Sequence, residues 1–425
     1  MALRDRIALL KNVHEKLQTG QIRLDPDQKC FGFKSLKLLF GVKKRDVKGY
    51  PCLAEANNLQ LAVKIIPLCS SHDFERHPAY IEIELLKLFT TLVEAYETPH
   101  ITHYMFDVQV HNKKRAMTQF PLKSLRKVAY GHSNVLVSEY VNGGSIQEWV
   151  KGSSSRVTSR QWKFIVFAIA WTLFILQDRY KFVHGDLHYG NILIDTTIAK
   201  KGSISYIMQT PDVPKKEYSI PCCGILPKLW DFEYASAYGI PNIGRNRFFG
   251  CDHKSMPNKF DPSFDIHMFL VSILELNIPD ALRNYIHETY PVQVIPTDDS
   301  DESDVGSDDD SDICTTDSGV SCGTDVADEL VNEEELSDFE ISSVCSNSSS
   351  TSSVVSEYYE TDEETIESTC SEHLHGTRLR MGYDKYFKLP TPLDILNGPY
   401  LKEFVSKNVK GKTPKPTSEF KYIRK

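Results

Sequence analysis

The sequence contains no Cys-x-x-Cys pair, although ten cysteines are scattered along its 425 residues. Structural zinc sites and the disulfide frameworks of small secreted domains depend on regular cysteine spacings, which this chain lacks. The adjacent residues Cys222 and Cys223 suit neither a zinc ligand set nor a simple disulfide. We therefore expect reduced thiols and a cytoplasmic protein.

The distribution of apolar and charged residues also predicts neither a secretion signal nor a membrane-spanning helix. Residues 1–18 carry charges throughout their apolar positions, which predicts an amphipathic helix instead of the apolar stretch of a signal peptide. The most apolar run, residues 164–176, has 13 residues, whereas a membrane-spanning helix needs about 20. We expect no transmembrane segment and interpret this run as part of a buried core helix.

Positive charge is absent from one long segment. Residues 298–372 contain 25 Asp and Glu, 25 Ser and Thr, and no Lys or Arg. A segment with so few large apolar residues cannot bury enough surface to offset the entropy lost on ordering. Because apolar residues and turn signals resume after it, we predict that residues 297–373 form a disordered acidic insert within a domain.

The rest of the chain is basic, since 49 Lys and Arg face 32 Asp and Glu there, a net charge of +17. Such an excess favours anionic partners: nucleotides, acidic protein substrates, nucleic acid or the surface of an anionic membrane. Solvated surface lysines explain the excess equally well, so charge alone leaves the partner open.

The apolar pattern divides the chain into a β-rich part and a helical part. Short β-type runs such as LQLAVKIIPL precede residue 140, and helical periods such as SRQWKFIVFAIAWTLFILQDRY dominate after it. We predict an α+β fold in six regions: a helical extension (1–29), a small β-rich lobe (30–140), a larger helical lobe (141–296), the acidic insert (297–373), a segment that completes the helical lobe (374–405) and a basic tail (406–425).

One lysine lies inside a β-type run. Lys64 is surrounded by apolar residues in LAVKIIP, and a buried cation is costly unless a carboxylate pairs with it. Glu82, 18 residues further on, shares a helix face with apolar residues and is the preferred partner, with Glu84 as the other choice. Phosphoryl transfer requires such a lysine over the phosphates, oriented by an acidic partner.

The stretch HGDLHYGN places an Asp and an Asn in a loop of the kind that several phosphotransferases share. Asp186 is the candidate base that accepts the proton of a substrate hydroxyl or orients that hydroxyl. Asn191, five residues later, offers an amide oxygen suited to Mg²⁺. We expect His184 to anchor the loop through backbone hydrogen bonds. Read alone, this motif also matches ordinary polar turns between a helix and a strand.

A further acidic residue follows the next apolar run, KLWDFEYAS. Asp231 is well placed to chelate a metal ion that bridges the β and γ phosphates of ATP, and we expect Phe232 to pack beneath it. An Asp at an ordinary turn after a strand is the plainer interpretation of the same residue.

The chain order of five polar residues resembles the signature of eukaryotic-type protein kinases: Lys64, Glu82, Asp186, Asn191 and Asp231. More narrowly, FDIHMFL and LPTPLDILNGPYLKEF resemble serine/threonine kinases of large nucleocytoplasmic DNA viruses. The resemblance implies a two-lobed protein-kinase-like fold, ATP and Mg²⁺, and γ-phosphoryl transfer to Ser or Thr hydroxyls of proteins. It also implies that the protein is located in the cytoplasm of the host cell, with the virion as a second location.

The resemblance assigns further site residues. VLVSEYVNGGSI is similar to a kinase hinge, which puts Ser138 at the gatekeeper position and Glu139 and Val141 beside adenine. Asp265 corresponds to the Asp that braces the catalytic loop, and Gly49 to the end of the glycine-rich loop. The implied ATP-binding residues are Lys64, Glu82, Gly49, Ser138, Glu139 and Val141.

Four features depart from the kinase pattern. No G-x-G-x-x-G precedes Lys64, and Glu233 replaces the glycine of D-F-G, which narrows the backbone conformations there and adds negative charge near the metal. His188 replaces a Lys that contacts the γ-phosphate, and a protonated His in that role would make catalysis sensitive to pH. The fourth departure is that no Ala-Pro-Glu follows Asp231. In addition, residues 201–226 form an insertion between Asn191 and Asp231.

Two other functions stay open. HGDLHYGN is also similar to the loop of aminoglycoside and choline phosphotransferases, which act on small molecules, although the hinge glycines Gly143 and Gly144 and the FDIHMFL helix fit protein kinases better. The missing glycine loop and Glu233 favour a pseudokinase that acts as a scaffold. A scaffold, however, has no physical need to keep all five core polar groups.

Overall fold

The computed structural model describes the following residues: 3–19, 35–38, 50–56, 59–68, 78–112, 131–153, 157–211, 213–240, 260–290, 370–374, 377–381, 389–406 and 416–424. Gly49 and nearly all of the acidic segment lie outside them, so the predicted glycine loop and the predicted disorder stay predictions. The described residues form both helices and sheets, which confirms the α+β prediction.

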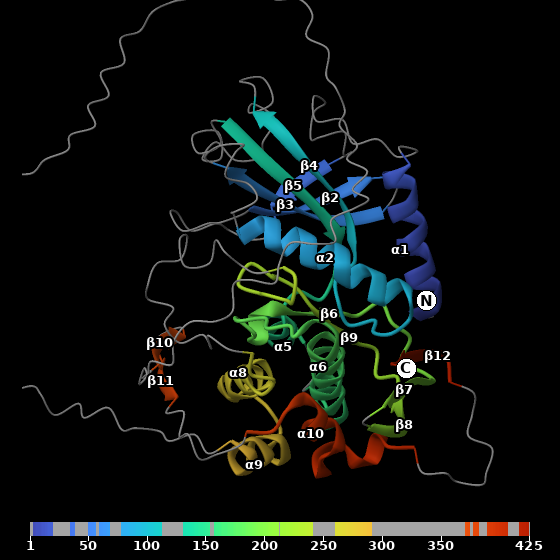
Figure 1. The fold of residues 1–425 in the computed structure, drawn as a ribbon, viewed down its shortest axis with the longest axis vertical. Coiled ribbons are helices and arrows are strands. Elements are labelled where there is room, and N and C mark those ends of the chain that lie inside the picture. Colours follow the sequence, from blue (N-terminus) through green and yellow to red (C-terminus); the bar gives the residue numbers. More distant parts are fainter. Residues whose placement is uncertain are drawn as a thin grey trace, which may run out of the picture. The chain divides into compact units, whose positions relative to one another are not determined.

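The β-rich part is an antiparallel sheet with the strand order β1-β2-β3-β5-β4 (Figure 1). Its strands, in that order, are β1 (Ser35–Leu38), β2 (Tyr50–Ala56), β3 (Leu59–Leu68), β5 (Gly131–Glu139) and β4 (Tyr104–Asn112). Side chains alternate along a strand, so Lys64 projects from the opposite face of central β3 to the buried Val63 and Ile65.

Two helices accompany this sheet. α2 (Pro78–Glu94) buries Leu85, Leu86 and Phe89, and Glu82 lies on the same inward face. α1 (Leu3–Gln18), the amphipathic helix expected near the start of the sequence, packs its apolar stripe against α2 and β4 (Figure 1).

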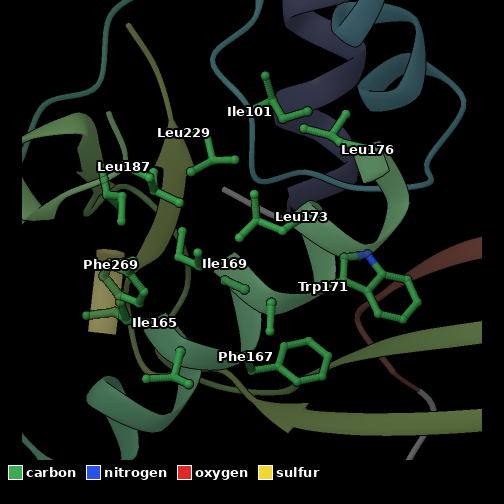
Figure 2. Packing of buried hydrophobic residues seen from close by; sticks show 14 of the residues in the cluster. Ile101, Ile165, Phe167, Ile169, Trp171, Leu173, Leu176, Leu187, Leu229 and Phe269 are labelled. Atoms are coloured by element: carbon green, nitrogen blue, oxygen red, sulfur yellow. The ribbon is translucent and has the colours of Figure 1, made fainter. Parts of the chain in front are cut away.

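The helical part is built around α6 (Ser159–Tyr180), whose residues are buried on nearly every side. Figure 2 shows Ile169 and Leu173 of this helix on the side of Leu187 and Leu229. Within the described residues, α6 is the one helix long and apolar enough to cross a membrane. However, 72% of its most apolar window is buried inside the protein, as expected for a core helix.

Shorter elements surround α6. They are α5 (Ile146–Gly152), η3 (Tyr189–Asn191), α8 (Phe264–Ser272), η4 (Ile273–Glu275), α9 (Asp280–Thr289), α10 (Pro392–Asn397) and η5 (Pro399–Phe404). α10 and η5 pack against α6 and bury Leu396 and Leu401. The segment that follows the acidic residues therefore returns to the core that α6 organises.

A second sheet has the strand order β12-β7-β8. β7 (Ser203–Thr210) and β8 (Val213–Pro221) form a hairpin, and β12 (Ser418–Ile423) runs parallel to β7. The insertion and the basic tail inferred from the sequence thus meet in this sheet. Phe420 and Tyr422 of β12 are fully buried, which explains why this part of the tail joins the core.

Two short pairs of strands complete the described structure. β6 (Ile192–Asp195) pairs with β9 (Leu226–Leu229), and β10 (Cys370–Leu374) pairs with β11 (Thr377–Met381). β10 contains residues 370–373, the last four residues of the insert predicted from the sequence.

Candidate active site

The β6–β9 pair brings the two acidic motifs together. HGDLHYGN ends where β6 begins, and Asp231 follows β9 by two residues. Between them, the backbone N–H of Trp230 donates to the carbonyl of Asn191 at 3.3 Å. Residues that are 40 positions apart in the sequence therefore become neighbours.

Lys64 lies among three carboxylates, which together with it we call the Lys64 cluster. Its Nζ is 2.7 Å from Oε2 of Glu82, 3.2 Å from Oδ1 of Asp231 and 2.6 Å from Oε1 of Glu233. An ammonium group has three N–H donors, so these contacts use all of them. Glu84, the other partner considered from the sequence, pairs with Lys87 instead.

Negative charge exceeds positive charge in the Lys64 cluster. Burial raises the pKa of Glu82 to about 8; Lys64 opposes this rise, and Asp231 and Glu233 add to it. Burial also acts to raise the pKa of Asp231, but the charge and the hydrogen bond of Lys64 act against it, and the pKa is lowered overall. Burial lowers the pKa of Lys64, yet the three carboxylates bring it well above its usual value. The lysine is therefore charged, and the cluster favours a further cation.

The turn after β9 is built on a left-handed residue. Asp231 has a φ of 63°, a conformation that Asp tolerates better than most residues. The sequence predicted the conformational constraint at Glu233, where the kinase motif has glycine. Positive φ falls on Asp231 instead, so a side chain at position 233 adds no backbone strain and reaches Lys64.

Phe232 anchors this turn in the core, as expected from the sequence. Its side chain is fully buried, and its ring meets Phe89 of α2 and Phe182 edge to face, with centroids 5.4 and 6.0 Å apart. The packing fixes the directions in which the flanking side chains of Asp231 and Glu233 leave the backbone.

Asp265, at the start of α8, holds the loop that precedes Asp186. Its carboxylate accepts hydrogen bonds from the backbone N–H groups of His184 and Gly185 at 2.8 and 3.0 Å. Burial lowers the pKa of His184 to about 4, so the ring is neutral at pH 7 and donates through Nε2 to the carbonyl of Trp230 at 3.1 Å. These contacts are of the anchoring and bracing kind that the sequence implied for the two residues.

Asp186 and Asn191 contact each other across the loop. Nδ2 of Asn191 donates to the main-chain carbonyl of Asp186 at 2.8 Å and to its Oδ2 at 3.2 Å. His188 accepts a hydrogen bond from the N–H of Gly190 through Nδ1, and its Nε2 lies 3.8 Å from Oδ2 of Asp186. A doubly protonated His188 would lose the contact with Gly190, so the expected phosphate-binding role requires this ring to move.

A cavity of about 260 Å³ opens beside Lys64. The predicted gatekeeper Ser138 and hinge residue Val141 both line it, and Ala62 and Leu193 add apolar walls. Lys64, Glu82 and Asp231 gather charge at one side of it, and Glu139 and Glu148 are the other charged residues of its lining. A slot with apolar walls and charge at one side suits a flat base that is linked to phosphates.

Two glycines allow the hinge to approach β6. A Cβ atom on Gly143 would lie 2.3 Å from the carbonyl oxygen of Ile194, closer than any side chain permits. The N–H of Gly143 donates to that same oxygen at 2.9 Å, and Gly144 has a φ of 69°.

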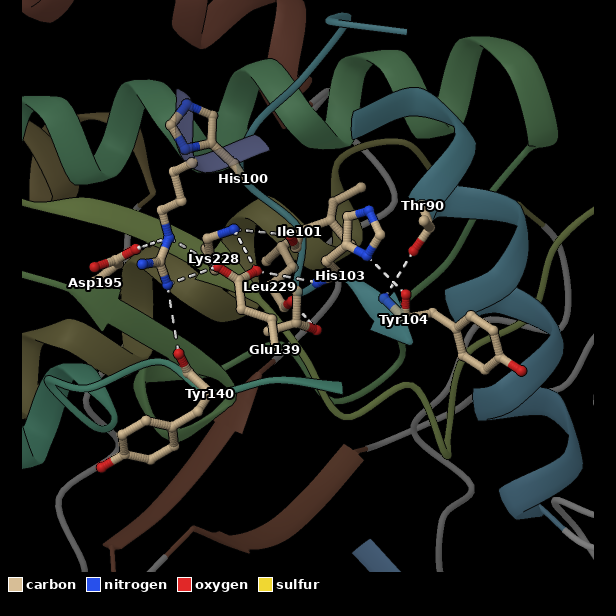
Figure 3. Close-up of polar contacts among 12 residues, drawn as sticks. Thr90, His100, Ile101, His103, Tyr104, Glu139, Tyr140, Asp195, Lys228 and Leu229 are labelled. Carbon is tan, nitrogen blue, oxygen red and sulfur yellow. Dashed lines mark hydrogen bonds and ion pairs between the residues drawn. The ribbon is translucent and has the colours of Figure 1, made fainter. Parts of the chain in front are cut away.

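Glu139 borders the same cavity, but its carboxylate enters a buried ion-pair network (Figure 3). Arg6 Nη2 lies 2.9 Å from Oε1, Lys228 Nζ lies 2.7 Å from Oε2, and the backbone N–H of His103 donates to Oε2 at 3.2 Å. Burial acts to raise the pKa of Glu139, but the two cations lower it. Any contact with nucleotide therefore falls to the main chain of Glu139 and not to its carboxylate.

Arg6 connects α1 to the hinge and to the end of β6. Its Nε lies 2.8 Å from Oδ2 of Asp195 at the end of β6, and Nη2 lies 3.5 Å from the carbonyl of Tyr140. We call Glu139, Arg6, Lys228 and Asp195 the Glu139 network. Three of these residues, Arg6, Lys228 and Asp195, were not predicted from the sequence. Lys228 could have been found as Lys64 was, because it lies in the apolar run GILPKLW and needs a buried partner.

Two known proteins are similar to this chain, and no family model matches it. The mimivirus protein R400 (Acanthamoeba polyphaga mimivirus) is 23% identical over 296 residues, which are 61% of this chain and 63% of that protein. The Dictyostelium discoideum protein DDB_G0286465 is 37% identical over 71 residues, 17% of this chain and 6% of that protein. The first is named a putative and the second a probable serine/threonine-protein kinase. These similarities support a kinase-like phosphotransferase at the level of the family.

Proposed function

We propose that the chain is a protein kinase that uses ATP and Mg²⁺ to phosphorylate Ser or Thr hydroxyls of proteins. The supporting observation is the convergence of Lys64, Glu82 and Asp231 on one cavity, next to the contacting pair Asp186 and Asn191. The proposal takes the five-stranded sheet with α2 as the small lobe of a kinase, and the part around α6 as the large lobe.

Nucleotide binding requires an exchange at Lys64. All three of its donors contact carboxylates, so a phosphate oxygen has to replace one of them. Glu233 is the contact that the kinase pattern lacks, and we expect its release. Lys64 then holds the α and β phosphates while Glu82 keeps the ammonium in place, and adenine lies between Ala62 and Leu193.

Asn191 and Asp231 would hold Mg²⁺. A carboxylate and an amide offer the oxygen donors that this ion prefers. Asn191 uses Nδ2 for Asp186, which leaves its amide oxygen for a metal. When bound, Mg²⁺ neutralises charge on the transferring phosphoryl group.

Asp186 would orient the incoming hydroxyl. Its side chain is 39% exposed, so a substrate can reach it, and the amide of Asn191 fixes one of its oxygens. Acidic proteins are the proposed substrates because the chain outside its acidic segment carries a net charge of +17.

The test is transfer of labelled phosphate from ATP, with Mg²⁺, to a panel of acidic and basic proteins. Asp186→Asn should lower the rate by about 10²–10⁴-fold, since it removes the proposed base without changing shape. Asp280→Asn, an exposed residue of α9, is the matched control and should keep the rate. Acid hydrolysis of labelled proteins should release phosphoserine or phosphothreonine.

Two results would contradict the proposal. Equal transfer by the wild type and Asp186→Asn would show that Asp186 is not the residue that handles the hydroxyl. Transfer to a hydroxylated metabolite but to no protein would place the chain with the small-molecule phosphotransferases.

A further inference from the structure

Two histidines and a glutamate meet where α1 packs on α2 and on the start of β4. Nδ1 of His14 lies 3.1 Å from Oε1 of Glu94, and Nε2 of His103 lies 3.2 Å from the same oxygen. The two imidazole rings stand edge to face with centroids 5.4 Å apart. All three possible ligand atoms lie within 4.8 Å of one another.

The hydrogen bond of His103 shows which ring nitrogen carries its proton. Nδ1 lies 2.6 Å from the carbonyl oxygen of Tyr104, which can only accept, so Nδ1 is the donor. In a neutral ring, Nε2 then presents a lone pair to the carboxylate oxygen of Glu94. Two acceptors at hydrogen-bond distance repel each other unless a cation lies between them. That cation is either a second proton on His103 or a metal ion.

The distances suit a metal ion. With metal–ligand bonds of about 2.0–2.2 Å, neighbouring ligand atoms of a tetrahedral zinc site lie about 3.3–3.5 Å apart. The observed separations from Oε1 of Glu94, 3.1 and 3.2 Å, lie slightly below this value, and the two imidazole nitrogens lie within 4.8 Å of each other. Binding therefore requires a shift of the His14 and His103 rings about one ion.

Outer contacts orient these ligands. Histidines that bind metal usually donate their other N–H to a carbonyl or carboxylate, as His103 does to Tyr104. Lys11 lies 3.9 Å from Oε2 of Glu94, which leaves Oε1 for the ion. Nε2 of His14 lies 3.4 Å from the side-chain amide of Gln18, whose carbonyl oxygen accepts from Nε2–H once the amide turns.

We propose that His14, Glu94 and His103 bind a Zn²⁺ ion, with water as the fourth ligand. Two imidazoles and one carboxylate suit Zn²⁺, whereas Mg²⁺ prefers a set of oxygen ligands. The ion joins α1 to α2 and β4. Because α1 also carries Arg6, the ion holds in place the helix that contacts Glu139 beside the cavity. This site does not depend on the proposed kinase activity.

The test measures binding of Zn²⁺ by calorimetry and of Co²⁺ by visible absorption, using the full chain after treatment with a chelator. His14→Ala is the main variant, because His14 is partly exposed and alanine favours a helix. Glu94→Gln is the second variant and keeps the shape of the side chain. His287→Ala, an exposed histidine in the last turn of α9, is the matched control.

We expect the wild type and His287→Ala to bind one more ion than His14→Ala and Glu94→Gln, or to bind it at least about 100-fold more tightly. The Co²⁺ spectrum of this site should be tetrahedral and lack a thiolate band. Zn²⁺ should raise the unfolding temperature of the wild type more than that of His14→Ala. Equal stoichiometry and affinity in all four proteins would overturn the proposal and leave a proton as the shared cation.

Discussion

The Lys64 cluster and the Glu139 network lie beside the same cavity but differ in their balance of charge. In the first, one cation faces three carboxylates; in the second, two cations share the carboxylate of Glu139, and one of them also meets Asp195. The Glu139 network is therefore balanced, with two positive and two negative groups. The Lys64 cluster has a surplus of negative charge.

We interpret this difference as that between a structural site and a proposed ligand site. A further ion does not stabilise a buried network whose charges already balance. This network instead holds the hinge, α1 and β6 together. A cluster with surplus negative charge, part of it in the 30% exposed side chain of Asp231, is stabilised by a further cation. In the proposed function, a phosphate oxygen replaces one of its carboxylates at Lys64. Substitutions that change one charge in each region test this contrast.

The largest effect is expected for Glu139→Gln. The change leaves the buried ammonium of Lys228, 2% exposed, without its ionic partner, and should lower the free energy of unfolding by about 3–5 kcal/mol. Urea unfolding followed by circular dichroism measures it. An unchanged midpoint would show that the network contributes little to the fold.

A smaller decrease in the free energy of unfolding is expected for Arg6→Ala. Glu139 keeps Lys228 as a partner in this variant, and Asp195 keeps two hydrogen bonds from the backbone N–H and hydroxyl of Thr197, so the loss corresponds to charged hydrogen bonds, about 2 kcal/mol. Lys11→Ala on the same helix is the control, because the side chain of Lys11 is 48% exposed and its contact with Glu94 is long. If both variants unfold at the same denaturant concentration, Arg6 does not fasten α1.

The surplus charge at Lys64 predicts how stability depends on pH. Folding raises the pKa of Glu82 from 4.5 to about 8, so the folded state binds more protons than the unfolded state between these values. Stability from this group is fully present below pH 4.5 and is lost as pH rises toward 8, by up to about 1.4 kcal/mol per pH unit. Unfolding of the wild type and Glu82→Gln across this range should show a flatter dependence in the variant; parallel curves would disprove the raised pKa.

The smallest effect on stability is expected for Glu233→Gln, the same chemical change as Glu139→Gln. Lys64 keeps Glu82 and Asp231, so the free energy of unfolding should change by less than about 1 kcal/mol. The variant removes one negative charge from the proposed phosphate site, and repulsion between two such charges is worth about 1 kcal/mol even in water. The Kd for ATP should therefore fall about fivefold. Calorimetry checks the affinity, and weaker binding would mean that Glu233 helps to hold the metal.

Local patterns were sufficient for the elements that build the cavity. β3 and α6 have the bounds of the apolar runs quoted from the sequence, LQLAVKIIPL and SRQWKFIVFAIAWTLFILQDRY. The contact of Lys64 with Glu82 followed from the cost of burying a cation, because the partner lies on the next helix. Such inferences succeed where one strand or one helix face determines the outcome.

Long-range pairings could not be inferred in the same way. β12 pairs with β7, more than 200 positions away, and no local pattern in the tail indicates this partner. Arg6 meets Glu139 across 133 positions for the same reason. Glu233 was noticed as a departure from the kinase pattern. Its contact with Lys64 depends on the left-handed turn at Asp231, which the sequence does not show.

The most direct test of the central claim, that the Lys64 cluster binds the phosphates of a nucleotide, is the affinity for ATP in the presence of Mg²⁺. Calorimetry would compare the wild type with Lys64→Met, after circular dichroism has shown that both are folded. The account predicts binding by the wild type and a Kd at least about tenfold higher for Lys64→Met, a loss of about 1.4 kcal/mol. Equal affinities, or no binding by either protein, would contradict it.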